Sequence, residues 1–277
     1  MFLFLLMYDD TIRTDPQTDS RRTKGEYKMK KILALVMALA LVVCASLALA
    51  EEETAELAPM TKEEFDLAEI DAPVCVEAYV QASQAWWAKD GIGRMTLYLQ
   101  DGDAGYFAYE VLMEEEEAAK LVPGTKIRIS GYKAEWSGEV EITEAKYEIL
   151  DAEPWIAEAE DVTALLGTEE LADHMNKKIA VKDAKVVASK VEGQDGEFAF
   201  LYNWDGSGSR DANSDLYFNV EVGGKTYTMT VESYLCGATT DVYGAVEALE
   251  IGQTIDLEGF LYWYNGANPH ITSVTVK

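Results

Sequence analysis

The chain contains two copies of one segment. Residues 121–132 (LVPGTKIRISGY) align with residues 249–260 (LEIGQTIDLEGF) at an offset of 128. The match continues through Trp136-Ser137-Gly138 and Tyr264-Asn265-Gly266 to an Ile-Thr pair in each copy. Each copy reads as a helix end, a glycine turn, an alternating strand, a glycine-containing hairpin and a last strand. This self-similarity predicts a duplicated, strand-rich unit.

The first copy has a clear order of elements. Alternating apolar and polar residues predict strands at 74–82, 95–99, 106–112, 126–133 and 139–149. A short acidic helix is expected at 114–121, between the third and fourth strands. Its carboxylates lie toward the N-terminal end, where the helix dipole favours negative charge. The order is therefore three strands, a helix and a two-stranded hairpin.

The second copy is predicted to follow the same order with one addition. We expect its first three strands at 178–189, 197–202 and 216–222, an extra hairpin strand at 226–232, a helix at 241–249, and final strands at 254–262 and 270–276. An acidic linker, 153–175, is expected to be helical, with Asp161 as a cap. The fold class expected for the whole chain is mainly β.

This order of elements resembles the OB-fold, a small five-stranded barrel with a helix between strands three and four. The resemblance covers residues 72–152 and 176–277, and it rests on element order and the internal repeat. It implies two tandem OB-like barrels joined by the short helical linker. The arrangement is also similar to the OB modules of secreted bacterial proteins.

Residues 29–50 have the pattern of a secretory signal peptide. Met29-Lys30-Lys31 precedes an apolar run, and Ala48-Leu49-Ala50 ends it before three glutamates, which predicts cleavage after Ala50. The protein is then secreted or in the cell envelope, residues 1–28 are an extension before the true start at Met29, and 51–71 form an acidic N-terminal segment. Two alternatives stay open. The run could be an uncleaved membrane anchor, or Cys44 could be a lipidated residue, although Val43 departs from that pattern.

Charge and residue counts limit the function classes. The chain has 23 Lys and Arg against 50 Asp and Glu, a net charge of −27, and such a balance disfavours binding to phosphate backbones. Three cysteines and two histidines exclude a metal cluster or a disulfide scaffold. Cys75 and Cys236, one in each copy, are expected to be free and buried. Because neither His174 nor His270 lies near a nucleophile motif, we expect a non-catalytic protein.

The resemblance implies that ligands bind on strands two and three and on the loops beside them. Aromatic side chains at these positions could stack on bases, sugars or protein side chains, or could simply fill the barrel ends. The candidate contact residues are Trp86, Trp87, Tyr98, Tyr109, Trp136, Tyr202, Trp204, Tyr262, Trp263 and Tyr264. The favoured partners are an envelope or extracellular protein, a neutral glycan or a cationic peptide. Single-stranded nucleic acid is the alternative, opposed by charge although Lys126, Arg128 and Lys133 share the fourth strand.

One loop of the second copy resembles the start of an EF-hand calcium loop. Asn203, Asp205, Ser207 and Asp211 place oxygen atoms at alternate positions, and glycine stands sixth. The resemblance ends at Ser214, which occupies the twelfth position in place of a bidentate glutamate. A solvated loop rich in turn-forming residues is the competing interpretation. Calcium is the one cofactor considered, in a calcium-stabilised structural module.

Overall fold

The computed structural model describes residues 57–277 with the exception of Gln194. The predicted upstream extension, signal peptide and cleavage site lie outside the described residues. Within the described part, no helix is both long enough and apolar enough to cross a bilayer.

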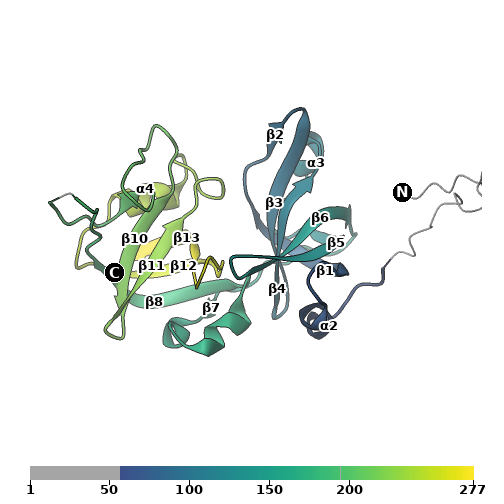
Figure 1. Cartoon of the computed structure of the whole chain (residues 1–277), viewed down its shortest axis with the longest axis horizontal. Coiled ribbons are helices and arrows are strands. Elements are labelled where there is room, and N and C mark those ends of the chain that lie inside the picture. Colours follow the sequence, from purple (N-terminus) through teal and green to yellow (C-terminus); the bar gives the residue numbers. More distant parts are fainter. Residues whose placement is uncertain (1–56, 194) are drawn as a thin grey trace, which may run out of the picture. The chain divides into compact units, whose positions relative to one another are not determined.

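The first copy folds as a closed five-stranded barrel (Figure 1). Its strands are β1 (Pro73–Ser83), β3 (Ile92–Asp101), β4 (Ala104–Leu112), β5 (Lys126–Trp136) and β6 (Glu139–Ile149). The strand order is β1-β5-β6-β4-β3, and pairing of β1 with β3 closes the barrel. Neighbouring strands are antiparallel except β4 and β6. The short helix α3 (Glu115–Ala118) lies between the third and fourth barrel strands, as predicted.

The second copy closes in the same way. Its strands are β8 (Lys178–Val187), β10 (Leu216–Val222), β11 (Lys225–Val231), β12 (Thr254–Phe260) and β13 (His270–Val276). The order is β8-β12-β13-β11-β10, closed by β8 and β10, and β11 runs parallel to β13. The helix α4 (Asp241–Glu247) again precedes the fourth strand. The prediction of a mainly β chain with two OB-like barrels is therefore confirmed.

Two strands of the second copy were assigned wrongly from the sequence. Residues 216–222 form the second barrel strand and 225–231 form the third, so the hairpin strand is not an addition. The predicted strand at 197–202 is reduced to β9 (Leu201–Tyr202), which pairs with the edge of β10. The first barrel has an equivalent in β2 (Trp87–Lys89), which pairs with β3. A two- or three-residue strand lacks a periodicity that sequence can reveal.

Two pairs of equivalent glycines explain why the repeat can be recognised in the sequence. Gly124 and Gly252 turn the chain into the fourth strand with φ of +94° and +96°, a conformation that side chains rarely adopt. Gly131 and Gly259 lie where the register shifts between the fourth and fifth strands. A Cβ on Gly131 would come within 2.5 Å of the Thr143 carbonyl oxygen, so each position has room only for hydrogen. The repeated sequence thus encodes the turn and the bulge of strand four.

The linker is short and irregular. It contains β7 (Glu160–Asp161), which pairs with β8, and the 3-10 helices η1 (Thr163–Leu165) and η2 (Glu169–His174). The Asp161 carboxylate accepts the Thr163 N–H at 3.0 Å, two residues along the chain, which is an Asx turn. Asp161 is not the predicted helix cap, because the N-cap residue of η1 is Val162, which makes no side-chain cap hydrogen bond. The predicted helical linker is therefore a pair of 3-10 turns.

The described part of the acidic N-terminal segment, residues 57–71, packs on the first barrel. Its helix α2 (Lys62–Leu67) begins with a capping box at Thr61 and inserts Phe65 into the barrel core. The buried Lys133 ammonium donates to the carbonyl oxygens of Phe65, Asp66 and Ala68 at 2.8–3.0 Å, at the C-terminal end of α2. The lysine therefore satisfies carbonyl groups that the helix end would leave unpaired.

Each barrel has its own apolar core. Cys75 and Cys236 are both free and buried, as predicted. A third, smaller cluster joins Tyr98 and Phe107 of the first barrel to Phe260 of the second. This cluster marks the junction at which the two barrels meet.

Candidate binding site

The junction is an aromatic contact between the two barrels. The rings of Tyr98 and Phe260 lie 4.7 Å apart, and Phe107 lies 5.3 Å from Tyr262. The Tyr98 hydroxyl is 2.7 Å from Nδ1 of His270, whose ring stacks on Tyr262 at 4.3 Å. Burial lowers the pKa of His270 to about 3, so the imidazole is neutral at physiological pH. His270 therefore packs and hydrogen-bonds in the junction.

Main-chain and amide hydrogen bonds extend this contact. The Ala85 N–H donates to the Tyr234 carbonyl at 2.7 Å, and the Asn265 N–H donates to the Ser137 carbonyl at 2.7 Å. The Gln84 amide donates to the Glu232 carboxylate at 3.2 Å. Because these bonds connect opposite barrels at several points, the surfaces beside the junction are held in a fixed arrangement.

A pocket of about 790 Å³ opens beside the junction, and we call it the composite pocket because both barrels line it. Six aromatic rings contribute: Phe107, Tyr109, Trp204, Tyr217, Tyr262 and Tyr264. Phe107 and Tyr109 come from β4, and Tyr217 comes from β10. Trp204 extends from the loop that follows β9 and is 75% exposed. The volume is in the range of small-molecule or side-chain sites.

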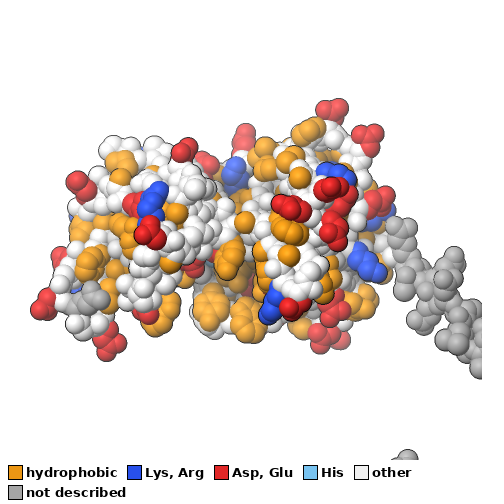
Figure 2. All heavy atoms as spheres, turned by 90° about the horizontal axis from the view of Figure 1, so that it is seen from above, with side chains coloured by type: hydrophobic (Ala, Val, Ile, Leu, Met, Phe, Trp, Pro, Cys, Tyr) orange, Lys and Arg blue, Asp and Glu red, His pale blue; other side chains and the backbone are white. Residues whose placement is uncertain are grey.

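Two carboxyl groups also line the composite pocket. Glu232 accepts the Leu235 N–H at 2.8 Å, and Asp215 accepts the Ser233 N–H at 2.8 Å. Burial raises the pKa of Glu232 to about 7, despite the hydrogen bonds that favour its charged form. Among the described residues that line this pocket, none is Lys or Arg. On the face drawn in Figure 2, acidic side chains lie over both barrels.

Two more buried glutamates lie close to the junction. Glu139 accepts the Trp263 N–H at 2.8 Å with one carboxyl oxygen, and the other oxygen has no hydrogen-bond partner. Burial raises the pKa of Glu139 to about 8 and that of Glu141 to about 7. Both carboxyls also raise the pKa of Tyr262, which lines the pocket. Near neutral pH, Glu139 is therefore mostly protonated and Glu141 is partly protonated.

The structure brings together four of the ten predicted contact residues. Tyr109, Trp204, Tyr262 and Tyr264 line the composite pocket. Trp263 lines a separate apolar pocket, and Trp87 lies under the Arg94 guanidinium at 4.7 Å in a third hollow.

The other four predicted residues lie outside the composite pocket. Tyr98 is fully buried in the junction, and the Trp86 indole donates to the Met113 carbonyl at 3.0 Å against the first barrel core. The Tyr202 hydroxyl donates to Glu247 of α4 at 2.6 Å. Trp136 is 61% exposed and lines neither this pocket nor the apolar one.

The three basic residues of the fourth strand of the first barrel are used within the fold. Lys126 and Arg128 pair with Glu77 at 3.5 and 2.8 Å, and Lys133 is buried against α2. Lys177 lies 3.5 Å from Glu160. The cationic groove expected of a single-strand binder is therefore not formed by these side chains.

The loop with the calcium-like spacing is organised by its own hydrogen bonds. The Asp205 carboxylate accepts the Ser207 N–H at 3.0 Å, and the Asn203 amide contacts the Ser207 hydroxyl at 3.4 Å. Such bonds are typical of a turn-forming loop. Within 57–277, apart from Gln194, no group of three or more His, Cys, Asp or Glu could hold a metal ion. Calcium binding here, which would also involve Asp211, stays a prediction.

Sequence reasoning missed several residues of the pocket. Phe107 and Tyr217 alternate with core residues along their strands, so an outward-facing position could have been inferred once those strands were assigned correctly. Asp215 and Glu232 carried no signal, because they are two carboxylates among 50 acidic residues. They become distinctive only through their position beside aromatic rings.

Comparison with known proteins yields likeness of fold only. No protein-family model matches the chain, and no curated protein matches it. Among solved structures, "Crystal structure of the tetrameric p202 HIN2" is 14% identical with a TM-score of 0.33, covering 76% of this chain and 97% of that one. "p202 HIN1 in complex with 12-mer dsDNA" is 12% identical with a TM-score of 0.30, covering 79% and 99%. A deletion mutant of the single-stranded DNA binding protein from Thermus aquaticus is 11% identical with a TM-score of 0.24, covering 74% and 93%.

Proposed function

We propose that this chain is an exported, non-catalytic binding module that takes a basic side chain of an extracellular or envelope protein into the composite pocket. The main observation behind this proposal is that six aromatic rings and the carboxyl groups of Asp215 and Glu232 line the same pocket. Aromatic faces attract organic cations, and nearby carboxylates strengthen that preference. The net charge of −27 also steers positive groups toward the molecule.

Protonation of Glu232 supplies a signature of cation binding. With its pKa near 7, Glu232 is partly protonated at neutral pH, and a bound cation favours the ionised form. Binding would therefore release protons, and affinity would increase as the pH rises from about 6 to about 8. The titratable groups whose charges act with Glu232 are Asp215, Tyr98, Tyr217, Tyr262 and Cys236. A neutral glycan would show no such dependence.

Titration calorimetry with a short acetylated, amidated peptide tests the proposal. One arginine in a glycine–serine background is the probe, and the same peptide with glutamine in place of arginine is its control. We expect saturable binding of the arginine peptide only. Trp204→Ala should weaken it about tenfold, because loss of a cation–π contact costs about 1–2 kcal/mol. Trp136→Ala is the matched control, since it removes another exposed indole outside the pocket.

Single-stranded nucleic acid is the alternative ligand. The OB-like fold and the exposed aromatic rings favour it, since rings stack on bases, whereas the internally paired Lys126 and Arg128 oppose it. Two of the solved structures named above are of DNA-binding proteins, and that binding is a property of those proteins. A ten-nucleotide oligothymidylate therefore joins the titration. If it binds, loses affinity with added salt and depends on Trp204 while the arginine peptide does not bind, the alternative replaces the proposal.

A further inference from the structure

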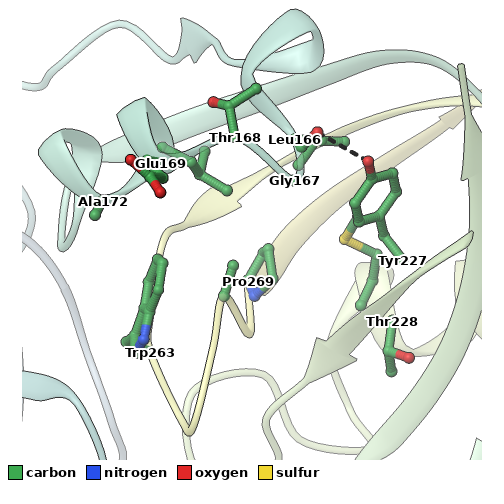
Figure 3. A pocket seen from close by; sticks show the side chains of 12 residues that line it. Leu166, Gly167, Thr168, Glu169, Ala172, Tyr227, Thr228, Trp263 and Pro269 are labelled. Carbon is green, nitrogen blue, oxygen red and sulfur yellow. Dashed lines mark hydrogen bonds between the residues drawn. The ribbon is translucent and has the colours of Figure 1, made fainter. Parts of the chain in front are cut away.

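The apolar pocket beside the composite pocket has a volume of about 620 Å³. It lies between the linker turns, β11 and the loop that joins β12 to β13. In Figure 3, Trp263 and Pro269 lie on one side, and the turn that carries Glu169 and Ala172 lies on the other. Leu166, Leu171 and Met229 also line it. The pocket thus combines linker and barrel residues.

The lining of this pocket favours an apolar group. The Tyr227 hydroxyl donates to the Leu166 carbonyl at 2.8 Å, as the dashed line in Figure 3 marks, so this polar group is already paired. Glu169 is exposed, and among the described lining residues none is Lys or Arg. Burying a large aliphatic or aromatic side chain against such walls is favourable because it removes apolar surface from water.

The Trp263 wall of the pocket is held in place by the first barrel. The main-chain N–H of Trp263 donates to Glu139, and a Cβ on Gly138 would come within 2.7 Å of the Trp263 indole ring. The hairpin between β5 and β6 therefore packs closely against the tryptophan. A wall fixed in this way needs little ordering when a ligand binds.

The hollows adjoin one another. Thr228 and Ala267 line both the apolar pocket and the composite pocket. Gln84 and Tyr109 are in turn shared between the composite pocket and the hollow of about 440 Å³ that contains Trp87. Successive hollows with common walls suit an extended chain that places neighbouring side chains in neighbouring sites.

From this continuity we infer that the apolar pocket is a second subsite, which takes a large apolar side chain near the basic residue of the same extended peptide. The inference rests on the proposed function, because the basic residue in the composite pocket positions the chain. The chemistry that would be recognised is a basic residue close to leucine, methionine or phenylalanine. A basic residue alone would bind more weakly.

Peptides that add one leucine to the arginine probe test this inference. The leucine is placed one, two or three residues to either side of the arginine, and affinities are measured by calorimetry. The variant Ala172→Phe fills the apolar pocket from an exposed position, and Ala164→Phe makes the same change on the exposed surface of η1, outside this pocket. We expect one spacing to bind about tenfold more tightly than arginine alone, a gain of the size that burial of a leucine can supply. Ala172→Phe should abolish that gain and Ala164→Phe should keep it.

The outcomes separate the two proposals. If the arginine peptide binds but no leucine position improves affinity more than twofold, or if the gain survives Ala172→Phe, the second subsite is refuted and the proposed function stands. If the arginine peptide fails to bind, the proposed function fails. Binding of the neutral apolar dye N-phenyl-1-naphthylamine then tests the apolar pocket by itself. Dye fluorescence that increases with the unmodified protein and with Ala164→Phe, but not with Ala172→Phe, supports an apolar site. No increase with the unmodified protein overturns the apolar site.

Discussion

The buried Glu139 makes the stability of this protein depend on pH. Burial raises its pKa from 4.5 to about 8. The folded state therefore holds the proton more tightly than the unfolded chain, so the free energy of unfolding falls as pH rises from about 4.5 to about 8. Each pH unit in this window costs up to about 1.4 kcal/mol. The whole window costs at most about 5 kcal/mol, a large share of the stability of a typical domain.

The substitution Glu139→Gln tests this reasoning. Glutamine keeps an oxygen that can accept the Trp263 N–H, but it cannot ionise. We expect the variant to be more stable than the unmodified protein at pH 8.5, by a few kcal/mol, and about equally stable near pH 5. Glu141 and Glu232 have pKa values of about 7, so stability falls with pH in both proteins. The difference between the two proteins isolates Glu139.

Urea unfolding at pH 5.0, 6.5 and 8.5, followed by tryptophan fluorescence and circular dichroism, gives these free energies. Glu135→Gln is the matched control, because Glu135 is an exposed residue of the same hairpin. It should leave the pH dependence unchanged. A Glu139→Gln variant less stable than the unmodified protein at pH 8.5 would refute the reasoning, as would an unmodified protein whose stability does not fall between pH 5 and 8.5.

Two substitutions address the junction and the repeat. Tyr98→Phe removes the hydroxyl bonded to His270 and should lower the free energy of urea unfolding by about 1–3 kcal/mol, since a buried polar atom loses its partner. The control Tyr109→Phe, at an exposed ring, should change this free energy little. Equal effects of the two substitutions would contradict the role of the hydrogen bond. Gly131→Ala should cost about 1–3 kcal/mol in Tm-derived stability, because its Cβ meets the facing strand. Gly244→Ala, in open space on α4, should be neutral or stabilising, and the reverse order would exclude the bulge explanation.

Most strands could be predicted because their patterns are local. In the interval 74–82, the alternate residues Val74, Val76, Ala78 and Val80 enter the first barrel core. The repeated glycines fix the turn and bulge of strand four in both barrels. The second barrel was harder because closure pairs β8 with β10 across a long loop. The pattern at 197–202 resembles a strand, yet only Leu201 and Tyr202 pair with β10, and Phe198 forms an isolated bridge with Ser189. Tertiary contacts, and not the local sequence pattern, decide which segment pairs with β8.

The candidate site was predictable in composition but not in arrangement. Aromatic residues on strands and loops pointed to Tyr109, Trp204, Tyr262 and Tyr264, which do line one pocket. The sequence held no signal that Tyr98 would be buried by the other barrel, while Trp136 would be left exposed. That distinction depends on how the barrels dock, and docking depends on contacts between residues more than 100 positions apart.

The docking has a consequence for how a duplicated domain acquires a binding surface. Tyr98 and Phe107 lie on the second and third strands of the first barrel, and they contact Phe260 and Tyr262 of the second. Each barrel is thus a permanent binding partner of the other, because both belong to one chain and their effective concentration is high. The composite pocket is the space left at the rim of that contact. Neither barrel could present this pocket alone, because residues of both line it.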